Sequence, residues 1–110
     1  VAYLPTCASV TDILIERLSR VDLLFFDGSF WSHDEMAKIG QAHRSASSMG
    51  HLPVSGPEGS LAMWRRAKIG RKIFIHINNT NPILIEDSAE RRLVEQAGWG
   101  IASDGQEYSL

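Results

Sequence analysis

The chain has 110 residues, of which 44% are hydrophobic and 22% are charged, a composition that is typical of a globular chain and excludes a disordered tail. Its length suffices for one modest hydrophobic core and excludes a two-domain enzyme with an interdomain cleft. Eleven basic and thirteen acidic residues give a net charge of −2, which argues against broad electrostatic binding of nucleic acid or of an anionic membrane surface.

The cysteine content and the start of the chain bear on its location. The single cysteine, Cys7, cannot form an intrachain disulfide or build a zinc knuckle by itself, so we expect a reducing compartment, the cytoplasm. No apolar stretch approaches the roughly 20 residues that a membrane span needs. The chain begins with Val1 and has no basic flank of a signal peptide. A start without Met leads us to expect the latter part of a longer protein.

Short apolar runs alternate with amphipathic stretches along the chain, which predicts an α/β fold. After an extended start over 1–4, apolar residues at helical spacing predict a helix over 9–20. The apolar run over 21–26 predicts a strand buried on both faces and central in a sheet, and the run over 72–77 predicts a second strand. Segments 99–102 and 107–110, separated by Asp104 and Gly105, predict a terminal hairpin or edge pair.

Three further segments begin with an oxygen-bearing side chain that is followed three residues later by Glu, the pattern of a capping box. The pairs are Ser32 and Glu35, Ser55 and Glu58, and Asp87 and Glu90. They predict short helices over 33–40, 57–67 and 88–97, the last of which ends at Gly98. The segment 41–56 is rich in Ser, Gly and Pro and is predicted to be a long loop.

Polar residues follow both predicted central strands. Asp27 ends the first strand and His76 ends the second. In open α/β sheets, functional groups gather just past the carboxyl ends of buried strands. A carboxylate and a neutral imidazole at one edge predict a site for zinc, iron or manganese. The alternative is that Asp27 begins a turn with Gly28 and that His76 is a hydrogen-bonded core residue.

Other candidate residues lie in loops. His51 stands between Gly50 and Pro53 in the long loop, either as a functional imidazole with a fixed backbone or as an exposed loop residue. Asn78 and Asn79 follow His76, where they either orient a metal ligand from outside or fix turns through hydrogen bonds to the backbone. No Gly-x-Ser-x-Gly sequence is present, which argues against a serine nucleophile.

Residues 24–31, 49–57 and 73–82, the last with the string Ile-His-Ile-Asn-Asn-Thr-Asn-Pro, resemble the coenzyme PQQ synthesis protein B family of the metallo-β-lactamase superfamily. The resemblance runs over essentially all 110 residues and covers the C-terminal portion of that family. It implies the C-terminal half of a metallo-β-lactamase-like αββα sandwich. The His-x-His-x-Asp-His motif that this superfamily carries in its first half does not occur in this sequence.

The resemblance also implies roles for individual residues. Asp27 matches the carboxylate that commonly bridges two metals, His76 matches the last histidine ligand, and His51 matches a position near the substrate that serves as an acid or proton relay. Since two ligands without the upstream motif hold a metal weakly, we expect this chain alone to be inactive.

The function that the resemblance implies is the biosynthesis of pyrroloquinoline quinone (PQQ), a redox cofactor built from a Glu and a Tyr of a precursor peptide. We favour an iron(II)-dependent, oxygen-using hydroxylation of the Glu-Tyr-derived intermediate, with zinc as the alternative metal. A metallohydrolase and a non-catalytic role in carrying or transporting PQQ or its precursor stay open. The implied partners are this precursor and other proteins of the PQQ pathway, without nucleic acid, and a homodimer stays open.

Overall fold

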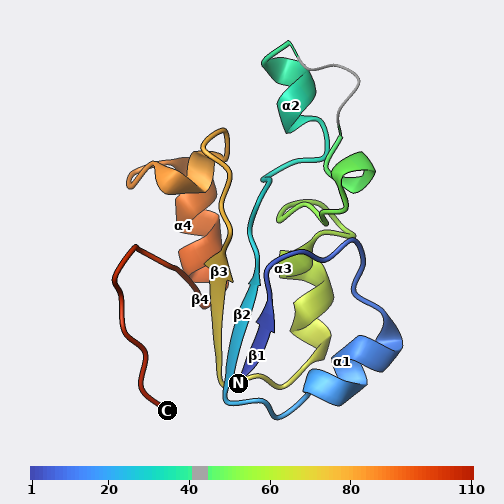
Figure 1. Cartoon of the computed structure of the whole chain (residues 1–110), viewed down its shortest axis with the longest axis vertical. Helices are drawn as coiled ribbons and strands as arrows, with labels where there is room; N and C mark the ends of the chain where they lie inside the picture. The colour runs from blue at the N-terminus through green and yellow to red at the C-terminus, as the bar shows by residue number, and fades with distance from the viewer. Residues whose placement is uncertain (41–44) are drawn as a thin grey trace.

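The computed structural model describes residues 1–40 and 45–110, and its centre is one parallel sheet. The strands follow the order β1-β2-β3-β4 and are β1 (Ala2–Leu4), β2 (Leu23–Asp27), β3 (Arg71–Ile75) and β4 (Trp99–Ile101). In Figure 1 the strands β2 and β3 run side by side and point the same way. Their register places Asp27 beside Ile75, so both strands end at the same edge. The predicted α/β fold is confirmed.

The described helices are short. They are α1 (Asp12–Leu18), α2 (Glu35–Lys38), α3 (Ser60–Met63) and α4 (Ala89–Gln96), with 3-10 turns at Ser47–Met49, Trp64–Arg66 and Pro82–Leu84. These turns fall within or beside segments that were predicted as loop or helix. Residues 41–44 of the predicted loop over 41–56 lie outside the described residues.

The predicted capping boxes are corrected by the structure. Helix α4 is capped by Ser88, whose hydroxyl accepts the Arg91 N–H at 3.1 Å, one residue later than predicted. Helices α2 and α3 begin after Asp34 and Gly59, and neither residue makes a side-chain capping bond. Both helices are shorter than predicted, and the predicted caps bond elsewhere: the Ser32 hydroxyl donates to Asp34 and the Ser55 hydroxyl donates to the Trp31 carbonyl. Gly98 does end α4, in the left-handed conformation with φ +85°.

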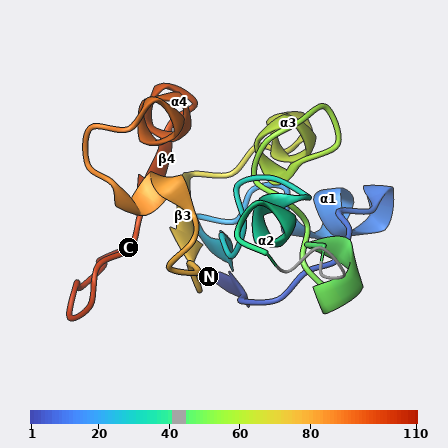
Figure 2. The same ribbon diagram turned by 90° about the horizontal axis from the view of Figure 1, so that it is seen from above.

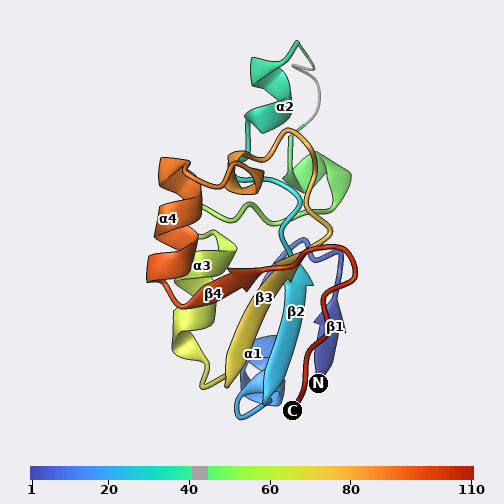
Figure 3. The same cartoon turned by 90° about the vertical axis from the view of Figure 1, so that its left-hand side faces the viewer.

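Helices cover one face of the sheet. Figures 2 and 3 show α3 and α4 on the same side of the strands. Phe26 contacts Trp64 at 5.4 Å between ring centroids, and Phe74 stacks on Trp99 at 4.0 Å. The buried core comprises Val10, Ile15, Leu24, Phe26, Val54, Trp64, Phe74, Ile83, Val94 and Trp99. Apolar burial on this face supplies the main stabilisation of the fold.

The C-terminal tail crosses the other face, as Figure 3 shows. Tyr108 packs edge-on against Phe25, with 5.1 Å between the ring centroids, and the Arg71 guanidinium donates to the carbonyl of Ser109. Segment 107–110 forms no strand, and β4 pairs in parallel with β3. The predicted terminal hairpin is therefore wrong, since the tail is held by side-chain contacts instead of a strand ladder.

None of the helices in residues 1–40 and 45–110 combines the length and apolar character that crossing a membrane requires.

We predict that Phe74→Ala lowers the free energy of unfolding by about 3–5 kcal/mol, because it removes a fully buried ring that stacks on Trp99. Urea unfolding measures the change. As a control, Ile13→Ala alters a side chain that is 66% exposed, and we expect a change within about 0.5 kcal/mol. Equal effects of the two substitutions would contradict the assignment of the core to the helix-covered face.

Candidate metal centre

Strand β2 carries Asp27 to the edge of the sheet, and a tight turn follows. A Cβ at Gly28 would lie 2.9 Å from the Cβ of Phe74, so only glycine lets the chain pass this close to β3. The Gly28 N–H donates to the Ile75 carbonyl at 2.8 Å and prolongs the pairing of the two strands. The backbone between Asp27 and Ser29 is therefore fixed against the neighbouring strand.

The Asp27 carboxylate is fully buried and surrounded by donors. Its Oδ1 accepts the Ser29 N–H at 3.0 Å and the Ser29 hydroxyl at 2.6 Å, and its Oδ2 accepts the Cys7 N–H at 2.9 Å. Hydrogen bonds to an ionised carboxylate are stronger than neutral ones. Asp27 is thus held in one orientation by segments that follow β1 and β2, which goes beyond the alternative of a simple turn residue.

His51 reaches the same carboxylate from the long loop. Its Nδ1 lies 2.6 Å from Asp27 Oδ2, and the residue is only 9% exposed. The backbone N–H of His51 donates to the Ala46 carbonyl, and the imidazole ring packs edge-on against Phe30. His51 is therefore a fixed, buried imidazole, so the alternative of an exposed loop histidine does not hold.

His76 approaches from the end of β3. Its Nδ1 lies 2.9 Å from the Ser29 hydroxyl and 4.0 Å from Asp27 Oδ1, while 54% of its side chain is exposed. The backbone of His76 has φ +55°, a left-handed conformation that costs free energy for a residue with a side chain. The alternative of a core residue does not hold, because His76 stands at the surface with one ring nitrogen turned toward Asp27.

The three side chains form one cluster. One donor atom each of Asp27, His51 and His76 lies within 4.8 Å of the other two, and the Ser29 hydroxyl is 3.2 Å from His51 Nδ1. A serine triad needs the two nitrogens of one imidazole to contact serine and carboxylate separately. Here the same Nδ1 of His51 faces both Ser29 and Asp27, so the arrangement suits a metal ion better than a triad.

The two asparagines after His76 differ. Asn78 donates its backbone N–H to the Ser29 carbonyl at 3.1 Å and its side-chain amide to the Thr80 hydroxyl. Asn79 is exposed, and within residues 1–40 and 45–110 its side chain has no hydrogen-bond partner. Asn78 therefore acts on the loops around the cluster, and neither amide contacts the Asp27 carboxylate or the histidine rings in the described part of the chain.

Sequence reasoning missed Ser29 and Cys7 as neighbours of the cluster. Ser29 directly follows Asp27 and Gly28, so its position after a buried strand was the available signal. Cys7 contributes through its backbone N–H, for which the sequence holds no signal. Burial raises the pKa of the Cys7 thiol, which keeps it protonated and argues against a nucleophilic role.

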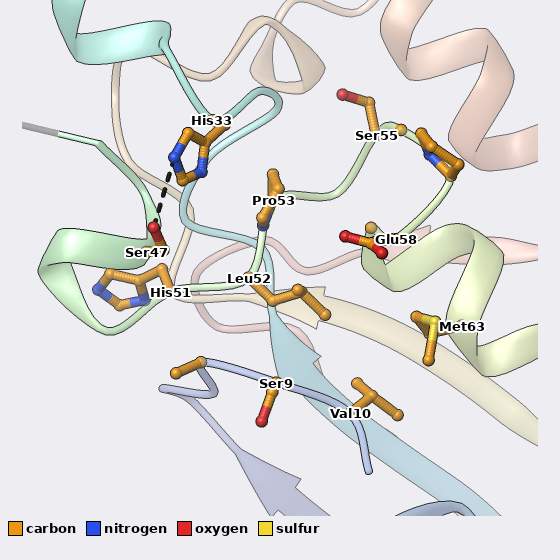
Figure 4. A pocket seen from close by; sticks show the side chains of 14 residues that line it. Ser9, Val10, His33, Ser47, His51, Leu52, Pro53, Ser55, Glu58 and Met63 are labelled. Carbon is orange, nitrogen blue, oxygen red and sulfur yellow. Dashed lines mark hydrogen bonds between the residues drawn. The ribbon is translucent and has the colours of Figure 1, made fainter. Parts of the chain in front are cut away.

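Two cavities flank the cluster. One, of about 690 Å³, is bordered by His51, His33 and Glu58, and Figure 4 shows His33 hydrogen-bonded to Ser47 at its rim. The other, of about 630 Å³, is bordered by His76 and Arg91, with Glu86 and Asp104 nearby. The two histidines of the cluster thus face different cavities, and the more exposed of them borders the second.

Comparison with known proteins identifies the family. A model of the β-lactamase superfamily domain matches residues 1–77. The chain is 49% identical over 109 residues to coenzyme PQQ synthesis protein B of Methylobacterium sp. (strain 4-46), covering 99% of the chain and 36% of that protein. It is 44% identical over 110 residues to the protein of the same name from Xanthomonas campestris pv. campestris (strain B100), covering all of the chain and 37% of that protein.

A solved structure agrees with the sequence comparison. Zn²⁺-bound PqqB from Methylobacterium extorquens superposes with a TM-score of 0.94 at 45% identity, over 98% of this chain and 39% of that one. The chain spans somewhat more than a third of the length of these relatives. It belongs to the β-lactamase superfamily and, within it, to the family of coenzyme PQQ synthesis protein B.

Proposed function

We propose that this chain is part of a protein of PQQ biosynthesis and that it supplies Asp27, His51 and His76 to a divalent metal ion. The observation that carries the proposal is the convergence of one carboxylate and two imidazoles within 4.8 Å at the edge of the sheet. The names of the relatives support the pathway, and the zinc in the Methylobacterium extorquens structure supports a metal. We take the chain to be the C-terminal portion of the complete domain.

The chemistry of the donor atoms fits such an ion. Carboxylate oxygen and imidazole nitrogen both bind iron(II) and zinc. Two histidines with one carboxylate form the ligand set of non-haem iron(II) oxygenases, which leave coordination positions open. We therefore favour iron(II), which supplies activation of molecular oxygen when bound, and keep zinc as the alternative.

The neighbouring residues would hold these ligands in place. The Cys7 N–H and the two donors of Ser29 fix the Asp27 carboxylate. The Ser29 hydroxyl also contacts Nδ1 of both histidines and orients their rings. The family resemblance implies an acid or proton-relay role near the substrate for His51. In this proposal His51 stands directly beside Asp27 and completes the donor set. Asn78 and Asn79 belong to the loop that carries His76.

We propose that the substrate approaches from the side of His76. His76 is 54% exposed at its side chain, whereas His51 is 9% exposed and Asp27 is fully buried. Arg91 also lines the cavity that His76 borders. Its Nε pairs with Glu95 at 3.1 Å and its Nη1 donates to the Ile83 carbonyl, and the guanidinium has further donors for a ligand carboxylate. A precursor derived from Glu and Tyr carries carboxylates, so Arg91 is suited to orient it there.

The reaction that we favour is oxidative hydroxylation of the tyrosine ring of the Glu-Tyr-derived precursor. Membership of the β-lactamase superfamily favours one alternative, metal-dependent hydrolysis. A non-catalytic role in carrying PQQ or its precursor is a third reading. We place the protein in the cytoplasm with other PQQ-pathway proteins as partners, since its one cysteine suits a reducing compartment.

We predict that Asp27→Asn or His76→Ala in the intact protein weakens metal binding by more than about 100-fold, because losing a hydrogen-bond partner of a ligand alone costs about 10–100-fold. Metal content and a metal titration measure the effect. His33→Ala changes an exposed histidine outside the cluster and should leave the affinity unchanged. Wild-type affinity in both ligand variants would refute the assignment.

We predict that the intact, iron-loaded protein consumes oxygen in step with the addition of oxygen to the Glu-Tyr-derived precursor. Mass spectrometry of the product and an oxygen electrode measure the two quantities together. Product formation without oxygen consumption would instead support hydrolysis. Equal binding of the precursor with and without metal, and no product, would support the carrier role.

We predict that Arg91→Gln raises the KM for the precursor by about 10-fold or more, because it removes a charge-assisted hydrogen bond to a carboxylate. Arg92→Gln is the matched control, since Arg92 is the exposed neighbour on α4 and does not border the cavity. Steady-state kinetics of both variants decide the point. Equal KM values for the two variants would move the substrate away from this cavity.

A further inference from the structure

Glu35 is a buried carboxylate close to the candidate metal centre. It is the first residue of α2 and is only 7% exposed, whereas the sequence predicts it as the partner of Ser32 in a capping box. Its Oε1 accepts the Trp31 N–H at 2.8 Å, and its Oε2 accepts the Thr80 hydroxyl. Glu35 therefore joins two segments that lie 49 residues apart in the sequence at Trp31 and Thr80.

These two segments carry the residues of the cluster. Trp31 lies two residues after Ser29 in the segment that follows β2, and Thr80 lies four residues after His76 in the loop that follows β3. The position of His76 relative to Asp27 thus depends on how these loops are held together. The strand pairing ends with the bond from the Gly28 N–H to the Ile75 carbonyl, so it does not extend to Trp31 or Thr80.

Further hydrogen bonds connect the same loops. The Asn78 side chain donates to the Thr80 hydroxyl, which in turn donates to Glu35, and the Asn78 N–H donates to the Ser29 carbonyl. The buried Asn81 donates its amide to the Gly28 carbonyl at 2.8 Å. Glu35 brings a negative charge to this network of otherwise neutral groups, and charge-assisted bonds are its strongest members.

The backbone of His76 makes this support necessary. Its left-handed conformation, φ +55°, is held only where the surroundings determine it. The hydrogen bonds of residues 78–81 supply that constraint immediately after His76.

We propose that Glu35 is a positioning residue: with Thr80 it braces the loop after β3 against the segment after β2 and so holds His76 at the separation from Asp27 that metal binding requires. This inference rests on the proposed metal site. Glu35 touches neither the Asp27 carboxylate nor the histidine rings, and it acts through Thr80 and the loop.

The test measures metal binding in the intact protein with Zn²⁺ and with Co²⁺, whose visible absorption reports the geometry of its ligands. For Glu35→Gln and Thr80→Val we expect the affinity for Zn²⁺ to fall about 10–100-fold and the Co²⁺ spectrum to change. Thr80→Ser keeps the hydroxyl and should restore wild-type values. Asp34→Asn removes a neighbouring carboxylate that is 64% exposed and should have no effect.

The double variant Glu35→Gln with Thr80→Val shows whether the two residues support metal binding together or independently. If the two residues act as one unit, the double variant binds Zn²⁺ as tightly as the single variant with the lower affinity, because the second substitution removes no further interaction. Thermal unfolding of the metal-free variants shows that each one is folded. Thr80→Val, which replaces one hydroxyl by a methyl group, keeps the test valid should Glu35→Gln fail to fold.

The outcomes distinguish this inference from the proposed function. Wild-type affinity and spectrum in Glu35→Gln and Thr80→Val, with metal binding lost in Asp27→Asn, would overturn the brace and leave the metal site intact. Equal binding in the wild type and in Asp27→Asn would overturn both. Equal losses in Thr80→Ser and Thr80→Val would also overturn the brace, since the hydroxyl would then be irrelevant.

Discussion

The structure depends on one buried charge, the carboxylate of Asp27. A carboxylate with no exposed surface is costly unless hydrogen bonds and opposite charge replace the water that it has lost. Two backbone N–H groups, one hydroxyl and one imidazole nitrogen surround it, and they come from Cys7, Ser29 and His51. Three irregular segments therefore meet at this carboxylate: the segment after β1, the segment after β2 and the long loop. Their hydrogen bonds to Asp27 hold them in position.

The parallel sheet explains why these segments meet at all. Strands β1, β2 and β3 are neighbours that point the same way, so their carboxyl ends lie along one edge. Asp27 is the last residue of β2, while Cys7 and His76 lie within three residues after the ends of β1 and β3. Three adjacent strands thus deliver a backbone donor, a carboxylate and an imidazole to one place. The sheet brings these groups to one edge, and the loops that follow the strands set their final positions and orientations.

The sequence predicted the parts of the fold that depend on long apolar runs. β2 is buried over most of its length, and β3 is buried at its centre. The ends of these strands predicted the meeting of Asp27 and His76, where His76 Nδ1 lies 4.0 Å from Asp27 Oδ1. Local patterns predicted less. The box of Ser32 and Glu35 has the correct spacing, yet the Glu35 carboxylate finds Thr80, a partner 45 residues away that no local pattern shows. The prediction of a C-terminal hairpin was wrong because β4 pairs with β3, which is distant in the sequence, and a local pattern does not show such a partner.

The two histidines of the cluster are held in place in different ways. His51 is buried against Phe30 and bound to Asp27, so its ring is fixed by packing and has little freedom to move. His76 is exposed, and its position is set by a strained backbone and by the loop behind it. In the proposed site the ligand approaches from the side of His76, because the His76 side chain is 54% exposed. Rigidity there cannot come from burial, and it therefore has to come from hydrogen bonds between loops, of which the Glu35 and Thr80 pair is the charged member.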